Sequence, residues 1–112
     1  MENFKKQALT FGGSKDLNLA SGNATSDALA VTENYIWNLS PNRVANVTGA
    51  PTYTVQVSNN GDDWYDFDTE LTNLAITSAA EVQGLSYGLI RVSVTANSAT
   101  GTIGFEFVTK SY

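Results

Sequence analysis

Five acidic side chains lie close together in the middle of the chain, in the stretch VQVSNNGDDWYDFDTE (residues 55–70). Carboxylate oxygens are the hard ligands that Ca²⁺ prefers, so the group forms a candidate calcium site. Its spacing does not follow the alternating pattern of an EF-hand loop, and acidic turns are commonly only solvated. We therefore expect no bound metal and no cofactor. The five residues kept as weak calcium candidates are Asp62, Asp63, Asp66, Asp68 and Glu70.

Two aromatic residues in the same stretch, Trp64 and Tyr65, favour a second interpretation, a platform on which a sugar ring stacks. The third interpretation is an ordinary hairpin tip. Asn60-Gly61 is a strong signal for a tight turn between antiparallel strands, because both residues tolerate positive φ. In that case the face of Tyr65 and Phe67 packs in the core, and Trp64 lies at the sheet edge or covers the turn. The sequence favours the hairpin tip.

No constellation for catalysis is present. The chain contains no histidine and no cysteine, so neither a Ser–His pair nor a thiolate nucleophile can form. Asp66 and Asp68 have the residue types for glycoside hydrolysis, but they share one face of an exposed strand, which lacks a deep cleft. Arg91, inside a later strand, is expected to pair with an acid or to line an interface. We expect a protein that is not an enzyme.

The charge balance excludes several partners. The formal net charge is −5, and only 6 basic residues are present. Nucleic-acid binding requires clustered basic residues, and so does attraction to an anionic membrane, so we expect neither partner. The N-terminal sequence lacks the apolar run of a secretory signal, and no stretch approaches the ~20 apolar residues of a membrane span. We expect a soluble protein made in a cytoplasm.

Alternating apolar and polar residues predict strands throughout, with turn residues between them. Residues 53–58, 87–96 and 101–110 show this pattern clearly, and both prolines, Pro41 and Pro51, are expected in turns. The predicted fold class is all-β: a single antiparallel β-sandwich, jelly-roll or Ig-like, with roughly seven to nine short strands. One domain is expected to span residues 1–112.

The first thirteen residues allow two interpretations. Residues 1–13 form either an N-terminal arm that reaches a partner or an ordinary first strand. In the arm interpretation, apolar and basic side chains make the contact with the partner. These candidate partner-binding residues are Phe4, Lys5, Lys6, Leu9 and Phe11.

Two motifs in the second half of the chain resemble a pattern found in small β-sandwich structural proteins of tailed bacteriophage virions. The first is the Ser-Asn-x-Gly-x-x-Trp hairpin, and the second is an aromatic-x-x-Ile-Arg-Val strand followed by a Thr-Gly-Thr turn. The resemblance covers residues 53–108, about half of the chain. The matching positions here are Ser58, Asn59, Gly61, Trp64, Tyr87, Ile90, Arg91, Val92, Gly101 and Thr102.

This resemblance implies a virion protein assembled in the host cytoplasm, most simply a capsid decoration (cement) protein, or else a head-fibre or tail accessory protein. The implied partners are capsid or other virion proteins, with a homo-oligomer left open, and the resemblance brings no catalytic residues. The alternative is a carbohydrate- or host-surface-binding β-sandwich module of a head fibre or tail, with Trp64 and Tyr65 as its sugar-binding residues.

Overall fold

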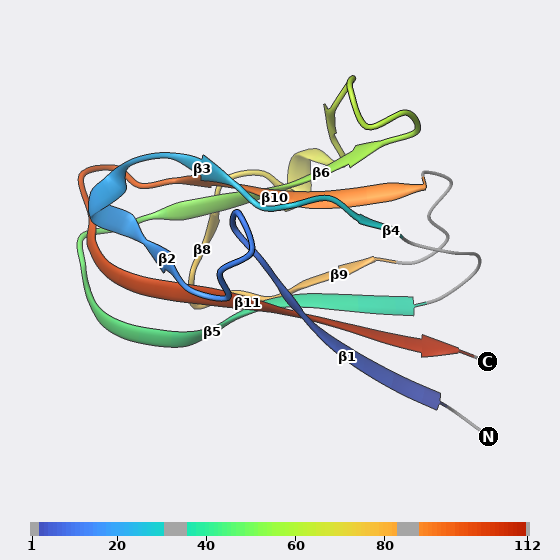
Figure 1. The fold of residues 1–112 in the computed structure, drawn as a ribbon, viewed down its shortest axis with the longest axis horizontal. Helices are drawn as coiled ribbons and strands as arrows, with labels where there is room; N and C mark the ends of the chain where they lie inside the picture. The colour runs from blue at the N-terminus through green and yellow to red at the C-terminus, as the bar shows by residue number, and fades with distance from the viewer. Residues whose placement is uncertain (1–2, 31–35, 83–87, 112) are drawn as a thin grey trace.

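A computed structural model describes the backbone of residues 3–30, 36–82 and 88–111, and the side chains of 6–30, 38–80 and 88–108. Two antiparallel sheets pack face to face in these residues (Figure 1). The all-β sandwich predicted from the sequence is confirmed. The described part has eleven strands where seven to nine were expected, because five of them are pieces of two residues.

The first sheet, called here the β5–β11 sheet, has the order β1-β11-β5-β9, with β2 beside β11. Its two longest strands are 13 and 12 residues in length. The strands are β1 (Asn3–Leu9), β2 (Leu17–Asn18), β5 (Ile36–Thr48), β9 (Ala80–Val82) and β11 (Thr100–Ser111).

The second sheet, called here the β6–β10 sheet, has the order β3-β10-β6-β7; β4 pairs with β10, and β8 with β6. Two single turns of 3₁₀ helix, η1 (Leu19–Ser21) and η2 (Thr69–Leu71), lie in the connections. The strands are β3 (Ala24–Thr25), β4 (Leu29–Ala30), β6 (Thr52–Ser58), β7 (Tyr65–Asp66), β8 (Leu74–Ala75) and β10 (Leu89–Thr95).

The core forms where the alternating apolar residues of the two sheets meet. The rings of Tyr53 on β6 and Phe105 on β11 pack edge to face, with centroids 5.1 Å apart. The Tyr53 hydroxyl donates a hydrogen bond to the carbonyl oxygen of Ser78, and burial raises the pKa of Tyr53 to about 12. The inward residues predicted from the alternation are buried: Tyr53, Val55, Val57, Ile90, Val92, Val94, Ile103, Phe105 and Phe107.

The expectation that Pro41 lies in a turn is wrong. Pro41 lies inside β5, opposite Phe105 of β11. Within the described residues β9 pairs with β5 only at residues 37–39, so β5 is an edge strand at Pro41, where the missing N–H is tolerated. Register shifts in the β5–β11 pairing and positive φ angles at Arg43 (47°) and Asn46 (54°) then bend the strand.

The N-terminal segment is part of the sandwich. Asn3–Leu9 forms β1, which pairs antiparallel with β11 along its whole length. Leu9 is only 2% exposed, and the Phe11 ring packs against Phe105 at 6.1 Å between centroids. Leu9 is therefore a core residue and Phe11 is half-buried against the core, so neither is a free partner contact, which corrects that part of the arm interpretation.

We predict that Leu9→Ala lowers the free energy of unfolding by about 2–5 kcal/mol, because it leaves a cavity in a closed core. Lys6→Ala, in the same strand but exposed, should change it by less than about 0.5 kcal/mol. Urea unfolding of both variants checks this. Equal values would mean that β1 does not belong to the cooperative unit.

Candidate functional site

The β6–β7 hairpin tip is built by its own polar side chains. The Ser58 hydroxyl accepts the backbone N–H groups of Asn60 (3.2 Å) and Gly61 (2.9 Å). The side-chain oxygen of Asn60 then accepts the N–H groups of Asp62 and Asp63, both at 2.9 Å. Asn and Ser fold turns in this way, and Gly61 supplies the positive φ of 82°. The predicted hairpin is confirmed, and its tip projects from the sandwich (Figure 1).

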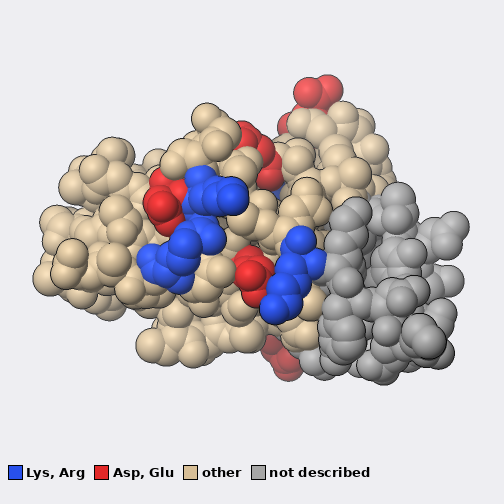
Figure 2. Space-filling view, turned by 60° about the horizontal axis from the view of Figure 1, so that its bottom comes forward, with Lys and Arg blue, Asp and Glu red and all other residues tan. Residues whose placement is uncertain are grey.

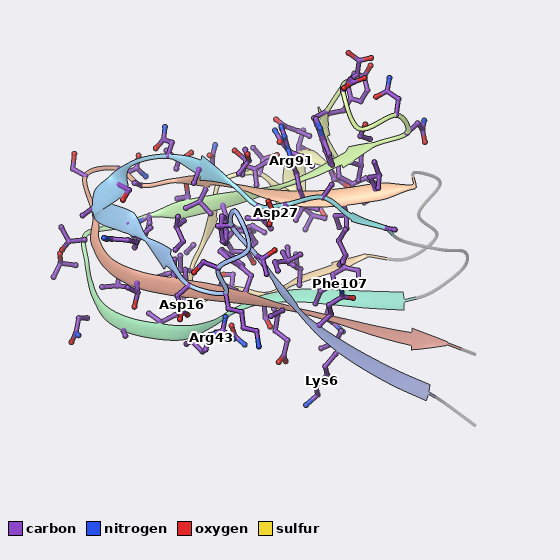
Figure 3. The ribbon with its side chains drawn as sticks, viewed as in Figure 1. Lys6, Asp16, Asp27, Arg43, Arg91 and Phe107 are labelled. Carbon is purple, nitrogen blue, oxygen red and sulfur yellow. The ribbon has the colours of Figure 1, made fainter. Side chains whose placement is uncertain are left out.

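Trp64 covers the turn, as one of the sequence interpretations expected. Its indole N–H donates to the carbonyl oxygen of Gly61 at 3.1 Å. The guanidinium of Arg91 on β10 lies 4.3 Å from the centroid of the Trp64 ring, a cation–π contact. The hairpin is thereby fixed to the outer face of the β6–β10 sheet (Figure 3).

Arg91 contacts an amide, whereas the sequence analysis expected it either to pair with an acid or to line an interface. Its Nε donates to the side-chain oxygen of Gln56 at 2.9 Å, and the amide nitrogen of Gln56 donates to Asp66 at 3.0 Å. Partial burial lowers the pKa of Arg91, but a guanidinium stays charged at neutral pH. The side chains of Trp64, Arg91, Gln56 and Asp66 thus form one continuous chain of contacts.

The five calcium candidates do not converge. Asp63 accepts from the Asn60 amide at 2.9 Å, and Asp68 accepts the N–H of Glu70 at 3.2 Å at the start of η2. Among the described residues, no group of three or more acidic side chains is arranged to hold a metal ion. In the structure Asp68 caps a turn, and Asp63 and Asp66 orient the amides of Asn60 and Gln56.

The two sugar-binding candidates differ in exposure. Trp64 is half-buried with Arg91 against its ring, whereas Tyr65 is 57% exposed. The expectation that Tyr65 packs in the core is wrong, because β7 is a two-residue strand at the sheet edge and both of its residues are exposed. Phe67, in contrast, packs against the core. A sugar would find one open ring, that of Tyr65.

A second polar cluster, which the sequence analysis did not find, surrounds Asp27. Its carboxylate accepts the Thr10 hydroxyl (2.7 Å) and the N–H groups of Gly12 (3.2 Å) and Gly13 (3.0 Å). These donors hold the pKa of Asp27 below its usual value; the Thr10 hydrogen bond is the main cause. The Gly-Gly pair signals a turn, but no local pattern links it to an acid fourteen residues away.

The outer face of the β5–β11 sheet carries most of the described basic side chains. Arg43 lies across Gly104, where a Cβ would overlap its guanidinium. It forms an ion pair with Asp16 at 3.0 Å and donates to the Lys15 carbonyl oxygen at 2.6 Å. Exposed Lys6, opposite Val108, lies on the same face (Figure 3). Of the other candidate partner residues, Phe4 and Lys5 lie in β1 with side chains outside the described set.

No protein-family model matches the chain, and no curated protein matches it. A solved structure described as "Bacillus endospore appendages form a novel family of disulfide-linked pili" is similar, with a TM-score of 0.55 and 16% identity over 98% of this chain and 87% of that chain. The Yersinia pseudotuberculosis-derived mitogen gives a TM-score of 0.43 and 10% identity over 100% of this chain and 86% of that one.

An exo-β-1,3-galactanase from Phanerochaete chrysosporium gives a TM-score of 0.37 and 18% identity; the match covers 96% of this chain and 27% of the enzyme. At these identities the likeness to the appendage protein shows the fold alone. The fold defines the chain as a small β-sandwich module, a class compatible with structural and binding roles. No helix among the described residues is long and apolar enough to cross a membrane.

We predict that the stabilising effect of Asp27 depends on pH. Because its folded-state pKa lies below that of an ordinary aspartate, the contribution is complete above the ordinary value and is lost as pH falls through the folded-state pKa. Asp27→Asn should therefore unfold at lower urea concentration than the wild type at pH 7, and the difference should disappear as the pH falls through the folded-state pKa of Asp27. Thr10→Val should act in the same direction. A pH-independent difference would contradict this account.

We predict that Trp64 and Arg91 stabilise the hairpin jointly. In a double-mutant cycle with Trp64→Leu and Arg91→Met, the coupling free energy should be about 0.5–1 kcal/mol, the range of exposed cation–π pairs. Urea unfolding of the four proteins measures it. Additive effects would mean that the ring and the guanidinium only lie near each other.

Proposed function

We propose that the chain is a non-enzymatic structural protein of a bacteriophage virion, a capsid decoration protein that binds the outer surface of the shell. The virion context comes from the Ser58–Trp64 hairpin and the Ile90-Arg91-Val92 strand. Of the matching positions, Tyr87 lies outside the described residues. The polar groups of the candidate sites hold loops in place and form no reactive centre in the described residues. The architecture is therefore compatible with a binding role.

The observation that carries the proposal is the open edge of the β5–β11 sheet. β1 is the terminal strand of that sheet, and along its seven residues no other described strand pairs with its outer side. Such an edge presents unpaired backbone N–H and C=O groups that a strand of another protein can join. The binding surface is then the edge of the first strand, which replaces a free arm.

The positive charges of this edge disfavour pairing with a second copy of the same edge. Lys5 and Lys6 are neighbours in β1, so two copies of the edge that approach each other bring like charges together. Lysine on edge strands discourages self-pairing in this way. An acidic or neutral strand of a shell protein meets no such repulsion. Many equivalent sites on a symmetric shell multiply a modest contact into stable attachment.

Co-sedimentation with empty shells of the major capsid protein from the same genome tests this proposal. Adjacent strand residues direct their N–H groups to opposite edges, so Lys6→Pro and Gln7→Pro form a matched pair. The variant that removes an N–H pointing toward β11 should break the β1–β11 pairing and lower stability. The variant that removes an N–H pointing toward the open edge should keep wild-type stability and lose shell binding at least tenfold. If the stable variant still sediments with shells, the β1 edge is not the contact.

The second candidate function, binding of a carbohydrate on a host surface, is favoured by one observation, the exposed ring of Tyr65. Tyr65→Ala removes this ring and leaves the Trp64–Arg91 contact in place. Glycan-array binding that is lost in Tyr65→Ala, together with an absence of shell binding, would favour this candidate. Shell binding unchanged in Tyr65→Ala is expected for the decoration protein.

A further inference from the structure

The charged residues are unevenly distributed between the two sheets. The outer face of the β5–β11 sheet carries three of the four basic residues whose side chains are described, and two acidic ones. They are Lys6, Lys15 and Arg43, with Asp16 and Glu106. These five described side chains sum to a surplus of one positive charge, although the whole chain carries a net charge of −5. In Figure 2 basic side chains gather on this face.

The opposite side of the sandwich is acidic. The β6–β7 hairpin carries Asp62, Asp63 and Asp66, with Arg91 as the single basic side chain described on its sheet. The hairpin projects away from the sandwich on the side opposite to β1 and β11 (Figure 1), while Lys6 and Arg43 lie on the side of those strands (Figure 3). One molecule therefore presents an acidic protrusion on one side and a basic surface on the other.

The two outer faces also differ in how they are covered. On the β6–β10 sheet, the outward Thr54 and Ser58 are buried (8% and 0% exposed), because Asn73 and the hairpin tip fold over them. On the β5–β11 sheet, the outward side chains of Lys6, Ala8 and Glu106 are exposed or half-buried. Arg43 and the Lys15 backbone cover this face at Gly104, but around Lys6, Ala8 and Glu106 the described part of the chain leaves it open.

We propose that the outer face of the β5–β11 sheet binds the acidic β6–β7 hairpin of a second copy of this chain. The contact joins two different surfaces, so it is heterologous, and its repetition produces a ring or an open row of copies. Lys6 and Lys15, which have no side-chain hydrogen bond or ion pair within the described residues, meet Asp62 and Asp63 of the next copy. This inference concerns contacts between copies and does not depend on a phage shell.

The geometry of this contact agrees with its chemistry. A narrow protrusion on a sheet face buries a small area, so each contact is weak and depends on electrostatic complementarity. Exposed charges are screened strongly at high salt, where the Debye length falls to about 3 Å at 1 M. The association should accordingly weaken as salt concentration rises, whereas an association through apolar surfaces would not weaken.

Charge reversal on each surface tests the proposal. The face variant is Lys6→Glu/Lys15→Glu, and the tip variant is Asp62→Lys/Asp63→Lys. Sedimentation velocity at low salt should show concentration-dependent association of the wild type. Each variant alone should associate at least tenfold more weakly, since like charges then face each other. Circular dichroism and urea unfolding establish that both variants are folded.

The decisive sample is an equimolar mixture of the two variants. The reversed face of the first is then acidic and meets the reversed, basic tip of the second, while the remaining native face and tip also match. Association should return to the wild-type level, with the variants alternating along the row. Thr25→Lys/Ala28→Lys, at two exposed residues of the β3–β4 region, is the control for added positive charge and should associate like the wild type.

Three results would overturn the inference: a wild type that stays monomeric at low salt, variants that associate like the wild type, or a mixture that fails to restore association. The test contains no shells, so its failure leaves the β1-edge proposal standing, and failure of shell binding leaves this one standing.

Discussion

The contact between the inner faces of the two sheets is the interaction on which the rest of the structure depends. Tyr53 of β6 and Phe105 of β11 meet at its centre, and both are completely buried. The chain has no cysteine, so no disulfide can hold the layers together in place of this packing. Leu9 and Leu19 are drawn into the same cluster. The first twenty residues are thus tied to the sandwich by burial and not only by strand pairing.

Because the core fixes only the strands, the connections are fixed by polar side chains. The hairpin tip depends on Ser58 and Asn60, the Phe11–Ser14 turn on Asp27, and the segment over Gly104 on Arg43. Each of these groups contains side chains that could bind a ligand if they did not already bind the protein's own backbone or side chains. In the structure they satisfy backbone donors and acceptors that would otherwise lack partners. Candidate chemistry in a small β-sandwich is therefore best sought in the surfaces that remain open.

The strands and their inward faces could be predicted because alternation is a local signal and the pleat has a period of two. Residues 53–58 and 89–95 follow it almost without exception. Pro41 and Tyr65 were placed wrongly because a local signal does not show where a sheet ends. Whether a strand position lies at a sheet edge depends on how far its neighbour strand extends, and residues far away in the sequence decide that. The contacts of Asp27 and Arg43 also join residues far apart in the sequence, so no local motif predicts them.

The site candidates were predictable in type but not in arrangement. The sequence identifies a turn with acids and aromatic rings, and such a turn is present at Asn60-Gly61. It does not indicate that Arg91 lies against Trp64, since that contact requires β10 and β6 to be neighbours. The Trp64 ring contacts Arg91, and Asp63 and Asp66 accept hydrogen bonds from amides, so most of these polar and aromatic groups are already occupied within the molecule. What the hairpin still offers to a partner is its shape and its negative charge, which are properties of a binding surface.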